Sequence, residues 1–540
     1  MARENQPRTI AQLLEATVAQ RGDQQALGLI ADGQLSWWSW TELDVAVRSL
    51  AVELQGRGVE PGTRVVQVAE NSGPWILADL ALLMIGAVHV PMHATASTAQ
   101  IAGQIAHCRP HLVLVDSQQR KTDLAAHLAN TVPILLHTEI PGLDSAIRSP
   151  PTAFPSALPD NLATILYTSG TTGRPRGVML SHNNLTSNAV AVTDVVEAGA
   201  DELRLCFLPL SHIYARTCDL YSWLYRGSRL VLAESRETIL RDCRLIGPEV
   251  LNGVPYFYQK VVQGVLGSDR AEASDGLRAA LGGNIQRCFC GGAAVAPEVD
   301  RIFTAQGLPL LAGYGLTEAS PVISATTPET SQAGCVGQPL PNVEVRISAT
   351  EANMGEILVR GPNVMLGYWD DPQATEESLV DGWLLTGDLG EFDASGNLRI
   401  LGRAKEIIVL STGKNVSPSG VETLLAGSPL IEQVCVVGEG RKCLAALVVP
   451  NPDALRAEIR RRRLWVWSRR RAVSHPQVRQ LYREQIDRLL AAVSPEERVG
   501  PFAILPRGFS VETDELTVKL SLRREVIAER FAGQIDRLYR

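Results

Sequence analysis

Two hydrophobic periodicities alternate along the first two thirds of the chain. Residues 10–20, 39–58 and 75–84 place apolar side chains at helical spacing. Short β-rich runs lie between and after these segments, and strands alternating with helices of this length predict parallel sheets with helices on both faces. We therefore expect two stacked, doubly wound α/β subdomains. The strand-like runs are 64–69, 88–91, 112–115, 134–137, 162–166, 204–208, 230–232 and 286–290.

The pattern changes in the last third of the chain. From residue 336 to 400 it consists of short strands separated by turns, which predicts a small β-barrel-like part. Residues 403–540 read as a smaller, compact α+β domain. A chain of 540 residues is too long for one core, so we expect a large N-terminal domain, residues 1–402, and a C-terminal domain, residues 403–540.

Charge is divided unevenly between these two parts. Residues 404–540 contain 23 basic and 16 acidic side chains, a net charge of +7, whereas residues 1–403 contain 28 and 42, a net charge of −14. A basic small domain over an acidic large one suits polyanionic substrates, but it also suits an anionic membrane surface. The net charge of the whole chain, −7, argues against a nucleic-acid partner.

Cysteine usage and the apolar runs indicate a cytoplasmic protein. The nine cysteines are scattered without metal-ligand spacing, which predicts reduced, structural thiols. The N-terminal residues show no signal peptide, and the longest apolar stretch, residues 80–90, is too short to span a bilayer.

Candidate chemistry is concentrated in a glycine- and hydroxyl-rich run, residues 167–177, of sequence YTSGTTGRPRG. Three glycines let backbone N–H groups turn toward an anion, and two arginines supply matching charge. The run follows the strand-like residues 162–166 and precedes residues 181–190, which read as a helix. A strand, such a loop and a helix would form a phosphate cradle. A surface turn rich in small residues is the alternative, and no Gly-Lys-Ser/Thr ending makes it a Walker A loop.

The run closely resembles the signature loop of the adenylate-forming superfamily, which includes acyl-CoA synthetases, adenylation domains of peptide synthetases and luciferases. Further motifs of that family follow in the same order, so the chain is identified as a member from about residue 10 to its C-terminus. They are Gly291-Gly292-Ala293, Gly313-Tyr314-Gly315-Leu316-Thr317-Glu318, Trp383-Leu384-Leu385-Thr386-Gly387-Asp388 and Gly402-Arg403-Ala404-Lys405-Glu406-Ile407-Ile408.

The resemblance implies a role for each motif in binding ATP and Mg²⁺. Glu318 would hold Mg²⁺ together with the hydroxyl of Thr168, and Tyr314 would stack on adenine. Asp388, placed in a turn after a β-like run, would accept the ribose hydroxyls. The alternatives are a polar surface turn for Glu318, a buried core position for Tyr314 and a backbone-capping turn for Asp388. The remaining nucleotide-binding candidates are Ser169, Gly170, Thr171, Thr172, Gly173, Arg176, Gly291, Gly292, Ala293, Gly315, Thr317 and Arg403.

Three apolar segments, residues 207–214, 253–260 and 364–369, are most similar to the long-chain fatty acyl-CoA synthetase branch. His212 lies where that branch places a side chain beside the acyl carboxylate, although a histidine in an apolar run is also typical of a core. An apolar tunnel gains about 0.8 kcal/mol per methylene buried. Chain length is therefore set by tunnel depth, which no motif encodes.

The resemblance also implies a C-terminal domain that swings about a hinge at Lys405 and a loop, residues 411–415 with Lys414, that lines the approach of the CoA thiol. Two positions depart from the family. Arg176 stands where a lysine is typical, in a chain with only six lysines and 45 arginines. The catalytic lysine of the C-terminal domain aligns with Ser521. If the segment is extended, Lys519 lies on the same face about 6.5 Å away and can serve instead.

Residues 460–471, of sequence RRRRLWVWSRRR, carry paired tryptophans flanked by arginines. Such a segment suits an anionic membrane interface. The pattern favours the alternative, a solvated helix with a tryptophan packing stripe.

We therefore predict an ATP- and Mg²⁺-dependent synthetase that joins a medium to long fatty acid to CoA through an acyl-adenylate. A ligase that loads an acyl carrier protein is one alternative, and a weakened acyl- and nucleotide-binding homologue, motivated by Ser521, is another. We expect a cytoplasmic location, with peripheral contact at the inner membrane surface as an open alternative. Acyl length, oligomeric state and pathway are left open.

Overall fold

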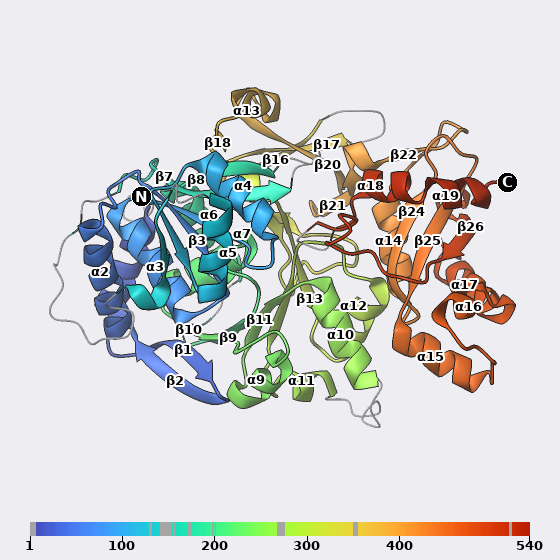
Figure 1. Cartoon of the computed structure of the whole chain (residues 1–540), viewed down its shortest axis with the longest axis horizontal. Helices are drawn as coiled ribbons and strands as arrows, with labels where there is room; N and C mark the ends of the chain where they lie inside the picture. The colour runs from blue at the N-terminus through green and yellow to red at the C-terminus, as the bar shows by residue number, and fades with distance from the viewer. Residues whose placement is uncertain are drawn as a thin grey trace.

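Figure 1 shows the computed structural model, with the N-terminal elements at the left and the C-terminal elements at the right. The structure describes residues 7–128, 132–140, 154, 157–169, 175–196, 199, 201–266, 276–348, 355–517 and 521–540. The predicted fold class is confirmed: a large mixed α/β N-terminal part precedes a smaller α+β C-terminal part. The boundary between residues 402 and 403 stays a prediction.

The first of the two large sheets has nine strands, and its six central strands are parallel. The three remaining strands are antiparallel and lie at its edges. In spatial order the strands are β15 (Gln338–Pro339), β14 (Val322–Ala325), β13 (Leu310–Gly315), β12 (Arg287–Cys290), β11 (Val250–Gly253), β9 (Leu203–Cys206), β10 (Arg229–Leu232), β1 (Gln25–Ala31) and β2 (Gln34–Ser39).

The second large sheet has seven strands, of which five are parallel and two, β8 and β18, are antiparallel. The order is β18 (Gly367–Tyr368), β8 (Pro175–Ser181), β7 (Leu162–Ser169), β4 (Val88–Met92), β3 (Arg64–Val68), β5 (Leu112–Val115) and β6 (Ile134–Leu136). The strand β18 comes from a distant part of the chain, so pairing with β8 joins sequence segments almost 190 residues apart.

Five layers result, because each sheet buries alternate side chains on opposite faces. One core lies between the sheets, against Val65 of β3 and Leu230 of β10. The next residues along each strand, Val66 and Val231, join two outer cores. The central helices are α1 (Ile10–Arg21), α2 (Trp40–Gly56), α3 (Gly73–Ile85), α6 (His182–Val196) and α8 (Ser222–Arg226). The outer helices are α4 (Thr98–Cys108) and α5 (Gln118–Leu128) on one sheet, and α9 (Ile239–Ile246), α10 (Pro255–Leu266), α11 (Gly276–Ala280) and α12 (Pro297–Ala305) on the other.

The part predicted to be barrel-like is a five-stranded antiparallel sheet. Its strands are β16 (Glu344–Ile347), β17 (Gly355–Arg360), β20 (Trp383–Phe392), β19 (Leu379–Val380) and β21 (Leu398–Arg403). The helix α13 (Pro372–Ser378) lies beside it. In the C-terminal part, a three-stranded sheet and a two-stranded hairpin are packed with six helices. These elements are β22 (Ile408–Val409), β23 (Asn415–Val416), β24 (Ile431–Val437), β25 (Leu444–Pro450), β26 (Val499–Ile504), α14 (Pro418–Ala426), α15 (Pro452–Arg461), α16 (Arg469–Ser474), α17 (Pro476–Leu489), α18 (Arg524–Arg530) and α19 (Ala532–Leu538).

A fully buried polar cluster crosses the central layer. Arg216, in the π-helical turn η2 (Arg216–Tyr221), forms an ion pair with Asp79 of α3 and donates a 2.8 Å hydrogen bond to Thr164 of β7. Tyr221 donates to the second Asp79 oxygen at 3.1 Å. Burial opposes ionisation of Asp79, but the charge of Arg216 and the interactions with His89 together outweigh it and lower the Asp79 pKa. Burial also lowers the pKa of His89, whose Nδ1 lies 2.6 Å from Asp79, to about 4.

The predicted reduced state of the cysteines agrees with the structure: all nine are free, and all but the half-buried Cys443 are buried. Among the described residues, no helix combines the length and apolar character needed to cross a bilayer.

The buried ion pair gives a stability prediction. Replacing Arg216 by methionine leaves the Asp79 carboxylate without its countercharge, which destabilises a protein by about 3–5 kcal/mol. We expect a large fall in the urea midpoint of unfolding. Tyr221→Phe, which removes only one hydrogen bond to a charged group, should cost about 1.5–3 kcal/mol and provides a milder variant.

The control is Arg301→Met, which removes an exposed ion pair to Glu298 of 2.7 Å. Exposed pairs contribute at most about 1 kcal/mol. Equal destabilisation by Arg301→Met and Arg216→Met would contradict the assigned importance of the buried cluster.

Candidate active site

The motif residues of the nine-stranded sheet gather at the carboxyl ends of its parallel strands. Gly253 of β11 lies opposite Cys290 of β12, which lies opposite Ala312 of β13. The turn Gly291-Gly292-Ala293 and the residues Tyr314 to Glu318 therefore leave the sheet at one edge. In open α/β sheets this edge is where ligands bind.

A second group of motif residues forms around Asp388. The hydroxyl of Tyr314 donates a 2.7 Å hydrogen bond to one carboxylate oxygen of Asp388, and Arg403 Nε lies 2.8 Å from the other. Arg403 reaches it because the two residues are partners in the β20–β21 pairing. Burial raises the pKa of Asp388, while the charge of Arg403 and the Tyr314 hydrogen bond oppose the rise. The sequence-based placement of Asp388 in a turn is wrong, because it lies within strand β20.

Glu318 lies in a short 3-10 turn directly after β13, where its side chain is half-buried. Its Oε1 accepts a 3.0 Å hydrogen bond from the hydroxyl of Tyr368 on β18. The guanidinium of Arg176, on the neighbouring strand β8, lies 5.3 Å from the centre of the Tyr368 ring. Tyr368 thus connects Arg176 of one sheet to Glu318 of the other.

Arg176 has a second contact, with Asp371 at 3.6 Å. Neither Tyr368 nor Asp371 was expected to take part in the site. The available signal was the segment 364–369, which was assigned to the fatty acyl branch as a whole.

The glycine-rich run joins two strands rather than a strand and a helix. Strand β8 pairs antiparallel with β7, with Thr168 opposite Arg176 and Ser169 opposite Pro175. The helix α6 begins only at His182, so the predicted strand–loop–helix order is wrong. The cause is strand pairing: β8 is bonded to β7 on one side and to β18 on the other. Gly170, Thr171, Thr172 and Gly173 lie outside the described residues.

Thr168 and Arg176 project from the same face of the hairpin, because directly opposite residues of antiparallel strands share a face. The side chain of Thr168 is half-buried. The predicted partnership of Thr168 with Glu318 stays a prediction, since the link between them runs through Arg176 and Tyr368.

His212 lies at the same carboxyl edge, in the segment that follows β9. It accepts a 3.2 Å hydrogen bond from the backbone N–H of Tyr214 and stacks on His93, with ring centres 6.1 Å apart. The Tyr214 ring covers Gly291 so closely that an added Cβ there would lie 3.1 Å from it. His212 and the Gly291 turn are therefore neighbours through Tyr214.

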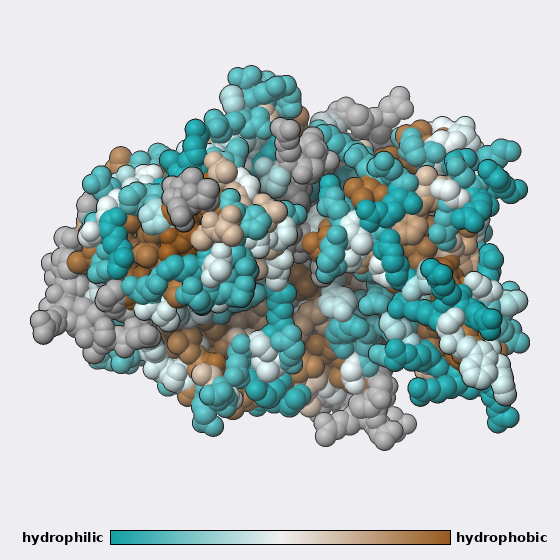
Figure 2. Space-filling view, viewed as in Figure 1, coloured by the Kyte–Doolittle hydropathy of each residue, from teal (hydrophilic) through white to brown (hydrophobic). Residues whose placement is uncertain are grey.

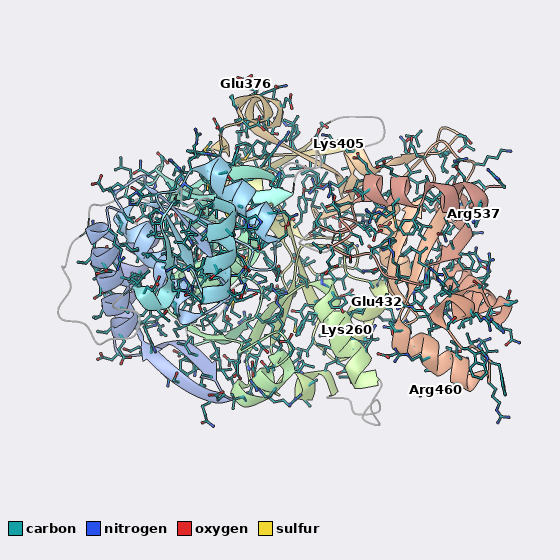
Figure 3. The ribbon with its side chains drawn as sticks, viewed as in Figure 1. Lys260, Glu376, Lys405, Glu432, Arg460 and Arg537 are labelled. Carbon is teal, nitrogen blue, oxygen red and sulfur yellow. The ribbon has the colours of Figure 1, made fainter. Side chains whose placement is uncertain are left out.

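Lys405 and Lys414 are exposed in the C-terminal part. Figure 3 places Lys405 at the junction of the large and small parts. Lys414 lies in the turn of the β22–β23 hairpin, where its carbonyl accepts a 2.9 Å hydrogen bond from Leu410. The parts also touch where Gln259 of α10 donates a 2.9 Å hydrogen bond to the carbonyl of Ala426 in α14.

Lys519 lies outside the described residues, but its flanks are described. Leu516 bridges Leu522 antiparallel, and Thr517 N–H donates to the carbonyl of Ser521 at 2.9 Å. The two flanks, Leu516–Thr517 and Ser521–Leu522, are therefore antiparallel neighbours. The extended placement of Lys519 beside Ser521 and the role of Lys519 stay predictions.

The site thus presents two arginines, two carboxylates and a tyrosine pair beside apolar side chains. Figure 2 shows a hollow between the large part and the C-terminal part, with apolar residues visible in it. Phe207, Tyr214 and Val254 are half-buried in the segments that follow β9 and β11. Such a constellation can bind a polyanion next to an apolar group.

Comparisons with known proteins agree with this geometry. Residues 14–369 match the family described as AMP-binding enzyme, and residues 405–540 match the AMP-binding enzyme C-terminal domain. The chain is 31% identical to the long-chain-fatty-acid–CoA ligase FadD15 of Mycobacterium bovis, over 93% of this chain and 92% of that protein. It is 32% identical to a feruloyl-CoA synthase of an Amycolatopsis species, over 74% and 80% of the two chains.

A solved structure of the O-succinylbenzoate-CoA synthetase of Bacillus subtilis with ATP and a magnesium ion has the same fold. The TM-score is 0.75 at 23% identity, covering 95% of this chain and 98% of that one.

The Asp388–Arg403 pair gives a pH-dependent prediction. In Arg403→Met the buried carboxylate loses its countercharge, so its pKa rises further and the folded protein is destabilised while Asp388 is ionised. We expect the free energy of unfolding to fall by on the order of 1–2 kcal/mol near neutral pH, between the values for exposed and buried ion pairs. The loss should shrink as the pH falls through the raised pKa and Asp388 becomes protonated, which thermal unfolding at several pH values measures.

The matched control is Arg399→Met, on the same strand, which removes a partly exposed 3.2 Å pair to Glu391. A loss in Arg403→Met that stays constant from acid to neutral pH would show that the Asp388 charge is not its cause.

Proposed function

The chain belongs to the AMP-binding enzyme family, and we propose that its acid substrate is a medium- or long-chain fatty acid. It is an acid–thiol ligase that uses ATP, Mg²⁺ and CoA. In the first step a carboxylate oxygen attacks the α-phosphorus of ATP, which forms acyl-adenylate and releases pyrophosphate. In the second step the CoA thiol, having lost its proton, attacks the acyl carbon and displaces AMP.

The choice of a fatty acid rests chiefly on the long-chain-fatty-acid–CoA ligase that this chain resembles along nearly its whole length. Other relatives act on different acids by their names, so family membership alone does not decide the acid. The apolar side chains at the carboxyl edge support the same choice. Tyr214 covers Gly291, and a Cβ added at Gly292 would lie 4.0 Å from the Val254 side chain. An acyl chain laid along them would gain about 0.8 kcal/mol per buried methylene.

The arginines and carboxylates of the site support a role in aligning the acyl carboxylate with ATP, two anions that repel each other. We propose that Arg176, with backbone N–H groups of residues 168–177, binds the β- and γ-phosphates, because guanidinium groups match phosphate oxygens in pairs. Asp388, oriented by Tyr314 and Arg403, would accept the ribose hydroxyls. Holding both reactants in line and stabilising the departing pyrophosphate are the main sources of rate in such a reaction.

The residues present suit a magnesium ion that arrives with its nucleotide. Glu318 uses one oxygen for the Tyr368 hydrogen bond, and its other oxygen has no hydrogen-bond partner in the described part of the chain. No group of three or more potential ligands occurs among those residues either. Mg²⁺ usually keeps water and phosphate oxygens as ligands and is coordinated by only one or two protein carboxylates. Once bound, the ion would neutralise phosphate charge; Glu318 would orient it.

The junction of the two parts fits the proposed swing after adenylation. Gly402 has a φ of +145°, and an added Cβ would lie 2.4 Å from Ser417 Oγ. A side chain there is therefore excluded just before Lys405. We propose that the backbone around Lys405 rotates and that the turn with Lys414 then approaches the thiol.

The assignment predicts a specific pattern of pyrophosphate release. With ATP, Mg²⁺ and a series of saturated fatty acids of increasing length, release should be fastest for a medium or long chain, since each buried methylene adds affinity. Aromatic acids such as ferulate serve as the control. A preference for ferulate would contradict the fatty acid assignment, and no release with any acid would support a binding protein without catalysis.

A second measurement identifies the acceptor. Addition of CoA should convert the adenylate to thioester, whereas conversion only with a holo acyl carrier protein would overturn the use of CoA.

Lys519→Ala tests the proposed catalytic amine. Loss of one charged donor to the transition state should slow acyl-adenylate formation by about 10²–10³-fold while ATP binding persists. The matched control is Lys442→Ala, another lysine of the C-terminal part, exposed on its surface. Unchanged adenylate formation in Lys519→Ala would exclude that lysine from the chemical step.

A further inference from the structure

Residues 460–471, named here the Arg–Trp ridge, stand out on the surface of the C-terminal part. The ridge runs from the end of α15 to the first turn of α16, and Figure 3 shows Arg460 at the lower right edge of the molecule. It contains seven arginines and no acidic residue. It takes no part in the nucleotide or acyl site proposed above.

The two tryptophans of the ridge point away from the core. Residues 464–467 belong to no helix, and they alternate in burial as an extended segment does. Leu464 and Val466 pack against the C-terminal core, whereas Trp465 is 84% and Trp467 78% exposed. The sequence-based interpretation as a helix with a tryptophan packing stripe is therefore wrong. The aromatic rings contact each other instead, with centres 6.0 Å apart.

The positive charge of the ridge is mostly uncompensated. Arg461 and Arg462 share the single carboxylate of Glu458, at 2.7 and 3.1 Å. The other five arginines form no ion pair within the described part of the chain. These five, all exposed, are Arg460, Arg463, Arg469, Arg470 and Arg471.

We propose that the Arg–Trp ridge docks the protein on an anionic lipid bilayer. Tryptophan prefers the interface between headgroups and acyl chains, where its ring is covered and its N–H stays hydrated. Arginines on both sides of the pair would bind lipid phosphates at the same depth. An acidic protein would pair with the arginines but would need a preformed pocket for two adjacent indoles. An anionic bilayer provides phosphates for the arginines and an apolar region for the indoles, and it needs no preformed pocket.

A neighbouring groove shares Arg461 and Arg462 with the ridge but is not part of the proposed docking surface. It lies between α15 and α17, has a volume of about 400 Å³, and is lined by Arg461, Arg462 and Arg488. Glu458 and Glu484 line it as well. Two carboxylates would repel a lipid phosphate, so the proposal is restricted to the ridge.

Docking does not depend on which acid the enzyme activates. If the acid is a fatty acid, docking would hold the C-terminal part at the membrane in which that substrate partitions. Failure of the fatty acid assignment would leave the docking test unaffected.

The test is co-sedimentation of the full-length protein with vesicles. Phosphatidylcholine vesicles containing about 30% phosphatidylglycerol should bind the protein, and vesicles of phosphatidylcholine alone should bind it much more weakly. Binding should fall with added salt, because charges at the surface are screened. Both Trp465→Ala/Trp467→Ala and Arg463→Glu/Arg470→Glu should reduce the partition coefficient by about tenfold or more.

The matched control is Arg244→Glu/Leu245→Ala, an exposed arginine and an exposed apolar residue on α9 of the large part. It should bind vesicles like the unmodified protein. All variants should keep their unfolding temperature and their activity on a short, water-soluble acid, since the substituted side chains are exposed and remote from the site. Equal binding to both kinds of vesicle, or unchanged binding of the ridge variants, would overturn the proposal. Ridge-dependent binding of an acyl carrier protein without vesicle binding would overturn it in favour of a protein partner.

Discussion

The hydrogen bond between Tyr368 and Glu318 joins the two halves of the large part at the site. Glu318 follows a strand of the nine-stranded sheet, and Tyr368 lies on the short edge strand of the seven-stranded sheet. Arg176 stacks on the same tyrosine from the hairpin that bears the glycine-rich run. Arg176, assigned to phosphate, and Glu318, assigned to the metal ion, therefore both contact the side chain of Tyr368. Displacement of β18 would separate them without touching either motif.

The elements with strong local patterns could be predicted from the sequence. Helix α2 and strand β3 appear close to their expected bounds because side-chain periodicity and burial agree there. The second strand of the β7–β8 hairpin was missed, and Asp388 was placed in a turn instead of in β20. Both errors have one cause: these residues are extended because of partners far away in the chain, and periodicity carries no information on distant pairing.

The candidate site was predicted as separate motifs, without the contacts that join them. Asp388, Tyr314 and Arg403 were all named, but the Asp388–Arg403 ion pair follows from the β20–β21 register, and the Tyr314–Asp388 hydrogen bond joins two different sheets. Tyr368 and Asp371 were missed because an aromatic residue after a glycine and an aspartate at the start of a helix have many common structural roles. The Arg–Trp ridge shows a complementary limit. Alternation over four residues is too short a signal to distinguish exposed tryptophans from packed ones.

The burial of nearly all the thiols has a practical consequence. Eight of the nine cysteines are enclosed, and burial raises the pKa of Cys108, Cys243 and Cys288 to about 12, so these sulfurs stay protonated and unreactive. Replacing the half-buried Cys443 by serine would leave a scaffold without a readily alkylated sulfur. A maleimide fluorophore could then be attached to one introduced cysteine on each side of the junction at Lys405. Energy transfer between the two dyes would follow the relative motion of the two parts during a single turnover.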